Sequence, residues 1–282
     1  MQHPDKWRET ADPFAIKFQS FQLENILGYP HAGNDVFHVE GIWKDQRCRA
    51  YLKIQRQAGA DIKREVEVLE RLSRKNTPEV LEWSVMPTCW LLTKEASGER
   101  LSVILGANEE QASMNYLPQY GHALAELHSM NIAVPAVADR RFFHLPPEEH
   151  FSKWNLEQTA GYLKSHKPEG ESQTFVHGDF HYANLLWEDG EVSAILDWEL
   201  AGRGVREFDM AWAVFCRPGQ RFLNTWQEVE GFLAGYAQTQ PFSKKAFCWY
   251  YSLITAWFFP MGDETDRGQW RALVEQAMNE PV

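Results

Sequence analysis

The sequence predicts an α+β fold in which a strand-rich first third precedes a mainly helical remainder. Segments that alternate apolar and polar residues come first, whereas after residue 98 apolar residues recur at helical spacing. Strands that precede helices favour a sheet-rich small part and a helical large part. A chain of 282 residues with 44% hydrophobic content can bury a sizeable core, and no repeat or Ser/Gly-rich linker divides it.

The first third contains the expected strands and one amphipathic helix. Residues 26–39 read as strand, loop and strand, and residues 47–55 as a further strand. A helix is expected at residues 61–73, because Asp61 is a good N-cap and an apolar stripe follows it at helical spacing. The stripe consists of Ile62, Val66, Leu69 and Leu72.

The remainder of the chain predicts a series of helices. They are expected at residues 116–130, 148–165, 207–216, 222–237, 244–258 and 267–278. The longest apolar-looking stretch, residues 249–261, is shorter than the roughly 20 residues that cross a bilayer. We therefore interpret it as a core helix.

The most informative segments are residues 175–187 and 195–199. Asp179 precedes Asn184 by five positions, and Asp197 follows thirteen residues later at the end of an expected strand. The intervening residues alternate around Asp189-Gly190, a dipeptide that suits a type I′ hairpin turn. Such a hairpin would return the chain so that Asp197 lies beside Asn184.

This pattern is typical of a phosphoryl-transfer site. Phosphoryl transfer needs a carboxylate that orients the acceptor hydroxyl, oxygen ligands for magnesium, and a cation on the nucleotide phosphates. Protein kinases place a catalytic Asp and a metal-binding Asn at the spacing of Asp179 and Asn184. Carboxylate and amide oxygens, as in Asp197 and Asn184, suit Mg²⁺. His177 is expected to support the loop and His181 to have no catalytic role.

Two alternatives from other classes remain open. His177, Asp179 and His181 form an H-x-D-x-H pattern that could bind zinc or iron in a hydrolase. That interpretation leaves Asn184 and Asp197 without a role. The other alternative is a catalytically silent nucleotide-binding protein.

The two motifs resemble those of the aminoglycoside phosphotransferase and choline kinase superfamily. His177–Asn184 matches H-G-D-x-x-x-x-N, and Asp197-Trp-Glu199 matches D-[WF]-[ED]. The resemblance implies a protein-kinase-like two-lobe fold, with a small antiparallel sheet and one helix in the N-lobe and a larger helical C-lobe. It implies ATP and Mg²⁺, Asp179 as catalytic base, and Asn184 and Asp197 as magnesium ligands.

The resemblance also implies upstream parts of a nucleotide site. Lys53 would bind phosphate, and Glu65 would pair with it; a solvated lysine is the alternative. The backbone of Gly33 and Asn34 would cradle phosphates, although an ordinary turn fits equally well. Residues 89–98 would form the strand that leads into the hinge, where the main chain of Lys94 and Ala96 would meet adenine. The corresponding lobes are residues 1–93 and 99–282, joined by a hinge at 94–98. Asp209 matches a family aspartate that supports the catalytic region.

Composition restricts the partners. The net charge of -11 argues against a nucleic-acid surface and slightly favours a cationic ligand. Residues 1–10 have no apolar core of a signal peptide, and the four cysteines form no C-x-x-C pair. We therefore expect a cytoplasmic protein with no membrane span; the pattern leaves its oligomeric state open.

The expected acceptor is the hydroxyl of a small, amine-bearing molecule, as in the aminoglycoside phosphotransferases. Choline, ethanolamine, thiamine, homoserine and sugars are alternatives within the same fold. The late helices carry aromatic and acidic residues that could hold an amine, although an aromatic stripe is more often core. These residues are Trp249, Tyr250, Trp257, Phe258, Asp263, Glu264 and Asp266.

Overall fold

The chain divides into two compact units that are described separately. The computed structural model describes residues 10–30, 33–56, 59–72, 76–106, 112–170 and 173–280. The first unit comprises Met1–Gly98 with Ser193–Leu200, and the second comprises Glu99–Val192 with Ala201–Val282. Most of the N-terminal segment considered for a signal peptide lies outside the described residues.

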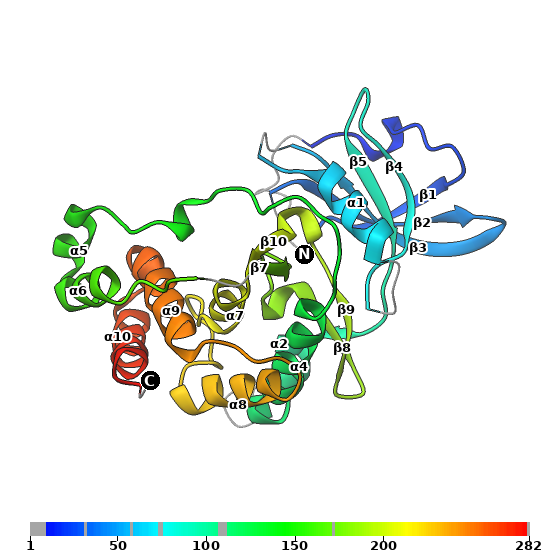
Figure 1. Cartoon of the computed structure of the whole chain (residues 1–282). Coiled ribbons are helices and arrows are strands. Elements are labelled where there is room, and N and C mark those ends of the chain that lie inside the picture. Colours follow the sequence, from blue (N-terminus) through cyan, green and yellow to red (C-terminus); the bar gives the residue numbers. More distant parts are fainter. Residues whose placement is uncertain are drawn as a thin grey trace. The chain divides into compact units, whose positions relative to one another are not determined.

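The first unit is built on a five-stranded antiparallel sheet (Figure 1). Its strand order is β1-β2-β3-β5-β4, so the last two strands exchange places relative to the sequence. The strands are β1 (Gln22–Gly28), β2 (Asp35–Trp43), β3 (Gln46–Ile54), β4 (Val80–Ser84) and β5 (Trp90–Lys94). The strand-loop-strand predicted at 26–39 and the strand predicted at 47–55 are confirmed, with shifted ends.

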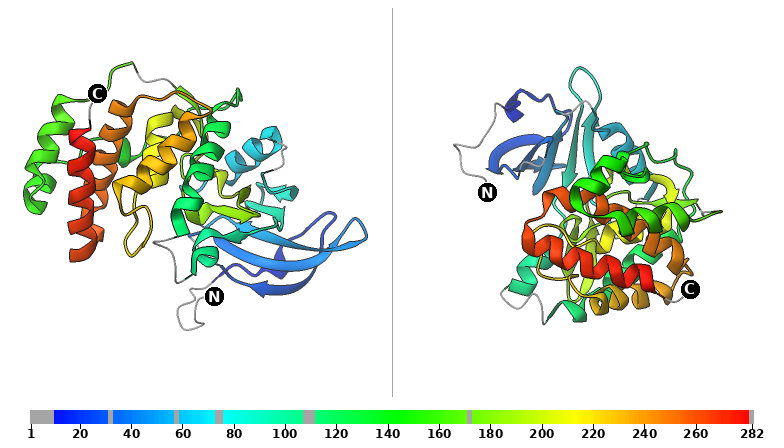
Figure 2. Two further views of the ribbon diagram at one scale, coloured as in Figure 1. Left: turned by 90° about the horizontal axis from the view of Figure 1, so that it is seen from below. Right: turned by 90° about the vertical axis from the view of Figure 1, so that its left-hand side faces the viewer.

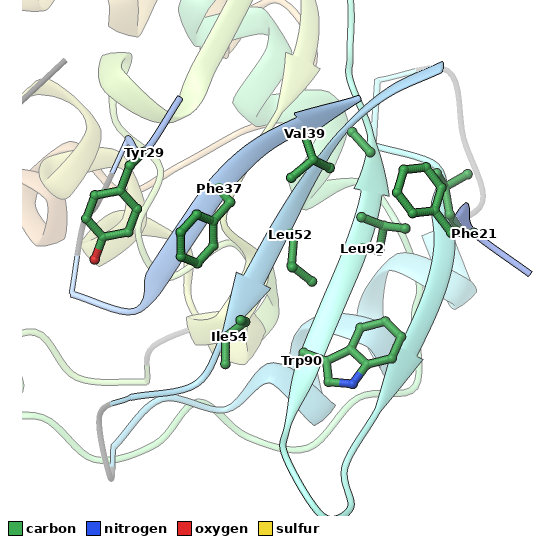
Figure 3. Packing of buried hydrophobic residues seen from close by; sticks show 10 residues of the cluster. Phe21, Tyr29, Phe37, Val39, Leu52, Ile54, Trp90 and Leu92 are labelled. Atoms are coloured by element: carbon green, nitrogen blue, oxygen red, sulfur yellow. The ribbon is translucent and has the colours of Figure 1, made fainter. Parts of the chain in front are cut away.

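The core of this unit lies on one face of the sheet (Figure 3). Leu52 and Ile54 of β3 are almost completely buried there together with Leu92 of β5 and aromatic rings from the flanking strands. Side chains alternate between the faces of a strand, so Lys53 points to the opposite face from Leu52 and Ile54. The apolar alternation of β3 thereby directs its lysine away from the core.

The helix α1 (Ile62–Leu72) follows the pattern predicted for residues 61–73. The Asp61 carboxylate accepts a hydrogen bond from the backbone N–H of Arg64 at 3.0 Å and so caps the first turn. Ile62, Val66, Leu69 and Leu72 are buried, as their spacing predicted, and Glu65 is buried with them. A carboxylate is therefore held on the packed face of α1.

The second unit is mainly helical (Figure 1). Its helices are α2 (Leu101–Leu105), α4 (Leu117–His128), α5 (Glu148–Trp154), α6 (Glu157–Ser165), α7 (Arg206–Val214), α8 (Trp226–Ala237), α9 (Lys244–Phe258) and α10 (Glu264–Asn279). Its short strands are β6 (Glu99–Arg100), β7 (Gln173–Val176), β8 (Leu185–Glu188) and β10 (Gly202–Val205). The strand β9 (Glu191–Ile195) begins in the second unit, and its residues from Ser193 onward belong to the first. Figure 2 shows α9 and α10 side by side.

Several sequence predictions hold in this unit. The helix predicted at 244–258 is α9. Separately from these predictions, no helix among the described residues is long and apolar enough to cross a membrane. The turn between β8 and β9 has the type I′ character predicted for it, because Asp189 and Gly190 both have positive φ, 51° and 81°.

Two predicted helices differ from the structure. The helix expected at 148–165 is broken into α5 and α6, because Asn155 adopts the left-handed conformation with φ of 53° and ends α5. The helix expected at 222–237 begins only at Trp226, because Leu223 has a positive φ of 59° and the Thr225 and Glu228 side chains form a capping box.

Helices α4 and α8 pack with close backbone contact. A Cβ added to Gly121 of α4 would overlap the carbonyl of Phe232, and one added to Gly235 of α8 would overlap the carbonyl of Pro118. These glycines let the two helix backbones approach each other. The pair holds His128 beside Tyr236, with 2.7 Å between Nδ1 and the hydroxyl.

Candidate active site

Three carboxylates surround the ammonium of Lys53 in the first unit. Lys53 Nζ lies 2.8 Å from Glu65 Oε2, 2.6 Å from Asp197 Oδ1 and 3.0 Å from Glu199 Oε2. Lys53 and Glu65 are nearly buried, with 14% and 7% of their side chains exposed. The structure thus brings together Lys53, Glu65 and Asp197 and excludes the solvated-surface interpretation of Lys53.

Local conformation places each member of this group. Asp197 has a positive φ of 66°, which an aspartate tolerates better than a branched residue and which turns the chain directly after β9. The next residue, Trp198, is buried, and its indole Nε1 donates to the carbonyl of Ile195 at 2.8 Å. Glu65 also accepts from the backbone N–H of Trp198 at 3.4 Å. The Asp-Trp-Glu segment is therefore fixed against α1.

Charge decides the protonation state of this group. Burial lowers the pKa of Lys53, but the charges of Glu65, Asp197 and Glu199 raise it, and the net pKa lies well above its ordinary value. Burial raises the pKa of Glu65, and the charge of Lys53 opposes this effect. The lysine is thus a permanent cation among carboxylates.

Glu199 is a member of this group to which the sequence assigned no role. It stands in the Asp-Trp-Glu motif, two residues after Asp197, which is the signal that could have identified it. One ligand oxygen from each of Glu65, Asp197 and Glu199 lies within 4.8 Å of the others. Carboxylate oxygens suit Mg²⁺, so the donor chemistry at Asp197 and Glu199 fits the metal that the sequence resemblance implies.

The residues predicted to contact nucleotide through the backbone lie in the same unit. Asn34 is buried, its Nδ2 donates to Glu199 Oε2 at 3.2 Å, and its Oδ1 accepts from the N–H of Arg56 at 3.1 Å. Gly33 has a positive φ of 99°. Lys94 ends β5, and its N–H donates to the carbonyl of Glu79 at 2.8 Å. A main-chain contact from Lys94 to adenine would therefore use its carbonyl.

Asp179 is the centre of a second group, in the second unit. Its Oδ1 accepts from the indole Nε1 of Trp212 at 2.7 Å, and its Oδ2 accepts from Asn184 Nδ2 at 3.2 Å. The same Asn184 nitrogen also donates to the Asp179 carbonyl at 3.0 Å. Asp179 and Asn184 are thus joined as their spacing predicted, and the amide oxygen of Asn184 is left for another partner. Trp212 was not predicted, because no motif spacing relates it to Asp179.

Asp209 holds the loop that carries Asp179. Its fully buried carboxylate accepts from the backbone N–H of His177 at 2.8 Å and of Gly178 at 2.9 Å. His128 Nε2 lies 3.2 Å from the same carboxylate. Asp209 therefore has the supporting role that the sequence suggested, and α4 and α7 share in holding the loop.

The carboxylate of Asp179 is strongly favoured over the acid. Burial raises the pKa of Asp179, but contact with His181 and the charges of Arg217 and His177 lower it to about 2. His181 Nε2 lies 3.6 Å from Asp179 Oδ2. His181 was expected to be a loop residue with no catalytic role. It does lie in the loop, where its Nδ1 caps a 3₁₀ turn, and its Nε2 lies beside the Asp179 carboxylate.

The histidines are used by the loop rather than gathered around a metal position. His177 Nδ1 accepts from the N–H of Asp179 at 3.2 Å, and His181 Nδ1 accepts from the N–H of Ala183 at 3.3 Å. Within the described residues, the ligand atoms of His177, Asp179 and His181 do not converge as those of Glu65, Asp197 and Glu199 do. The arrangement gives no support to the metal-dependent hydrolase.

The residues considered for an amine site are mostly committed elsewhere. Trp249 and Tyr250 are buried in the core, and Trp249 Nε1 donates to the carbonyl of Leu163 at 2.8 Å. Asp263 and Asp266 form the capping box of α10. Trp257 and Phe258 alone among the aromatic candidates remain partly exposed.

An antiparallel sheet with one packed helix and a mainly helical second unit are the architecture of protein-kinase-like phosphotransferases. A family model described as "Phosphotransferase enzyme family" matches residues 29–242. The chain belongs to this family.

Solved structures share the fold. A choline/ethanolamine kinase family protein from Mesorhizobium loti is similar with a TM-score of 0.61 and 17% identity, covering 96% of this chain and 92% of its own. A thermostable mutant of aminoglycoside phosphotransferase APH(4)-Ia, in a ternary complex with AMP-PNP and hygromycin B, is similar with a TM-score of 0.63 and 14% identity. The match covers 92% of this chain and 96% of that structure's chain. Amicoumacin kinase hAmiN, in complex with AMP-PNP, Ca2+ and Ami, is similar with a TM-score of 0.52 and 14% identity. The match covers 92% of this chain and 88% of that structure's chain.

A curated relative matches only part of the chain. "Acyl-CoA dehydrogenase family member 10" from Mus musculus is 40% identical over 60 residues, which are 21% of this chain. The match spans 6% of the length of that relative.

Proposed function

We propose that the protein is an ATP- and Mg²⁺-dependent kinase that transfers the γ-phosphoryl group of ATP to a hydroxyl of a small molecule. The observation that carries this proposal is the contact of Lys53 with both Glu65 and Asp197, at 2.8 and 2.6 Å. A lysine held by a helix carboxylate beside a metal-binding aspartate is the arrangement with which protein kinases bind nucleotide phosphates. The hAmiN and APH(4)-Ia structures described above are complexes with AMP-PNP, which supports ATP as the donor.

The first unit would supply the nucleotide contacts. Lys53 would bind phosphate oxygens, with Glu65 keeping its stem oriented. The backbone at Gly33 and Asn34 would lie against phosphate, and the carbonyl of Lys94 and the N–H of Ala96 would meet adenine. Asp197 and Asn184 would hold Mg²⁺, and Glu199 is a further candidate ligand because its carboxylate lies with that of Asp197. Magnesium, when bound, would neutralise charge on the phosphates.

Asp179 would act on the acceptor. With a pKa of about 2, its carboxylate is ionised throughout the physiological pH range and can accept a hydrogen bond from an acceptor hydroxyl. Trp212 and Asn184 each donate to one of its oxygens, which fixes the orientation of the carboxylate. The acceptor oxygen is thereby oriented for attack, and its proton passes to Asp179.

Several kinds of acceptor are compatible with the proposed kinase. An aminoglycoside-like, amine-bearing acceptor is the sequence-based prediction, and choline-, ethanolamine-, thiamine-, homoserine- or sugar-type acceptors fit the same fold. Two of the neighbours described above hold chemically different molecules, hygromycin B and Ami, so the fold does not choose among acceptors.

The test is an ADP-release screen across amino alcohols, aminoglycosides, vitamins, sugars and hydroxy acids. We expect at least one acceptor to accelerate ADP release. Asp179→Asn should lower kcat for that acceptor by about 10²- to 10⁴-fold and change the KM for ATP little, because only proton acceptance is removed. Asp139→Asn, which changes an exposed carboxylate paired with His144, is the matched control. Full turnover by Asp179→Asn would exclude Asp179 as the base.

A further inference from the structure

Two arginines flank the proposed base. The guanidinium carbons of Arg140 and Arg217 lie 5.5 and 5.6 Å from the ring centre of Trp212. Trp212 is the residue whose indole donates to Asp179 at 2.7 Å. Asp179 also contributes to the electrostatic environment of both guanidinium groups. Positive charge is therefore concentrated around the carboxylate that would receive the acceptor hydroxyl.

Neither arginine has an acidic partner among the residues that the structure describes. Arg140 donates from Nη2 to the carbonyl of Gly178 at 2.8 Å. Arg217 donates from Nη1 to the carbonyl of Phe215 at 3.1 Å and from Nη2 to that of Trp212 at 3.3 Å. A guanidinium has five N–H donors, so each arginine retains donors beyond these contacts.

Burial makes these charges costly. Burial lowers the pKa of Arg140 and of Arg217, although the charge of Asp179 opposes the effect. A partly buried cation without an ion-pair partner gains from an anion that arrives with a ligand. Arginine also matches the planar geometry of a carboxylate, which it can bind with two parallel hydrogen bonds.

An aromatic surface continues from Trp212. The ring of Phe142 lies 5.1 Å from that of Trp212, 5.3 Å from that of Phe258 and 6.2 Å from that of Trp257. Phe142, Trp257 and Phe258 are only partly buried. The guanidinium of the exposed Arg141 lies 4.8 Å from Phe142 and 5.4 Å from Trp257. Apolar rings and a third cation thus extend the site.

The carboxylates close to these arginines in the sequence or the fold are already used. Asp139 pairs with His144 at 2.7 Å, and Asp209 holds the loop of Asp179. Glu207 accepts from the N–H of Ser243 at 3.0 Å. Apart from Asp179, an ammonium group on the acceptor would therefore meet arginines and carboxylates that already have a hydrogen-bond or ion-pair partner.

Resting on the function proposed above, we propose that the acceptor is a hydroxyl-bearing organic anion. Arg140 and Arg217 bind its carboxylate or phosphate group, and its apolar part lies on Phe142, Trp257 and Phe258. In the reaction, the bond between the γ-phosphorus and the bridging oxygen of ATP breaks, a bond forms to the acceptor oxygen, and the hydroxyl proton passes to Asp179. The products are ADP and a phosphate ester that keeps the original anionic group.

The experiment compares acceptors that are matched in length and differ in charge. Straight-chain hydroxy acids, hydroxyl-bearing phosphate monoesters, amino alcohols and neutral diols are tested for ADP release with the full chain. We expect at least tenfold higher kcat/KM for one of the anionic classes than for the amino alcohols. The better of the two anionic classes identifies the group that the arginines bind.

Substitutions then show where the anion binds. Arg217→Gln should raise the KM for the anionic acceptor at least tenfold. The KM for ATP should rise by a smaller factor. Arg141→Gln should raise it by about threefold, because the exposed guanidinium is more strongly screened by solvent. Arg141 makes only ring contacts through its side chain, so this variant remains informative if Arg217→Gln does not fold. Arg203→Gln, which removes an exposed charge on β10, is the matched control.

Three results would overturn the proposal. Amino alcohols could be better acceptors than both anionic classes, neither anionic class could accelerate ADP release over the rate without acceptor, or the arginine variants could raise mainly the KM for ATP. In each case, Mg²⁺-dependent binding of AMP-PNP that is lost in Asp197→Ala shows that the nucleotide site of the proposed kinase stands. Wild-type binding of AMP-PNP that does not depend on Mg²⁺ indicates failure of the proposed function itself.

Discussion

At the scale of single residues, the Lys53 group has an electrostatic balance that depends on one cation. One ammonium faces Glu65, Asp197 and Glu199, and each contact is 3.0 Å or shorter. The pKa of Lys53 is raised, so its protonation stabilises the folded state fully below 10.5, its value when unfolded, and this contribution is lost as the pH rises above it. Below pH 9 the wild type therefore keeps the charge.

Lys53→Met should destabilise the protein in a pH-dependent way. Without the ammonium, three carboxylates remain close together, and the buried Glu65 should take up a proton that it does not bind when unfolded. The folded variant then binds more protons than the unfolded chain. As the pH rises from 5 to 8, its free energy of unfolding should therefore fall by up to about 1.4 kcal/mol per pH unit. Urea unfolding of the variant and the wild type at several pH values measures this difference.

Lys63→Met is the control for that experiment, because Lys63 is an exposed lysine of α1 that pairs with Glu67 at 3.7 Å. It should follow the wild-type pH dependence. If the free energy of unfolding of Lys53→Met and of the wild type changed with pH in parallel, the ionisation of the three carboxylates would not depend on Lys53.

At the scale of elements, the sequence pattern predicted the helices whose ends are set by local interactions. The helix expected at 61–73 is α1, because an N-cap and a regular apolar stripe specify it. The helix expected at 148–165 breaks at Asn155, where a single left-handed residue is stabilised by the surrounding fold as much as by its own preference. Composition alone does not reveal such a choice.

The close packing of α4 and α8 gives a test at this scale. Gly121→Ala should destabilise the protein by about 2 kcal/mol or more, because its Cβ would overlap the backbone of Phe232 and neither backbone can give way cheaply. Thermal or urea unfolding measures the change. Activity should fall as well, because displacement of α8 moves Tyr236 away from His128, which supports Asp209.

Gly161→Ala is the matched control. Gly161 lies in α6, and nothing lies within 4 Å of the Cβ that alanine would add. This substitution should stabilise the protein by roughly 0.5–1 kcal/mol, because alanine loses less backbone entropy in a helix than glycine. Equal effects of the two substitutions would show that helix propensity, rather than the contact between α4 and α8, decides the outcome.

At the scale of the whole molecule, the sequence predicted the family and the residues of its motifs but not their surroundings. Asp179, Asn184 and Asp197 follow from spacing between two neighbouring motifs, whereas Lys53 and Glu65 follow from the family resemblance that those motifs carry. Trp212, Arg140 and Arg217 contact or flank Asp179 from segments about 30 to 40 residues away. No periodicity relates these segments, so only the folded chain shows that two arginines lie near the base. The net charge of -11 slightly favoured a cationic acceptor, whereas this local arrangement is the basis for the anionic acceptor proposed above.

The nucleotide and the metal should act on the whole molecule through linked binding. A ligand that binds the folded state alone stabilises it by about 2.7 kcal/mol at a hundred times its Kd, so AMP-PNP with Mg²⁺ should raise the melting temperature by several degrees. AMP-PNP with EDTA should raise it less, because the phosphates then lack the metal that would join them to Asp197. Asp197→Ala should remove the difference between the two conditions. Asp45→Ala, which replaces a carboxylate of the turn between β2 and β3, should keep it. A metal-dependent shift that survives in Asp197→Ala would assign the magnesium to other ligands, of which Glu199 is the first to examine.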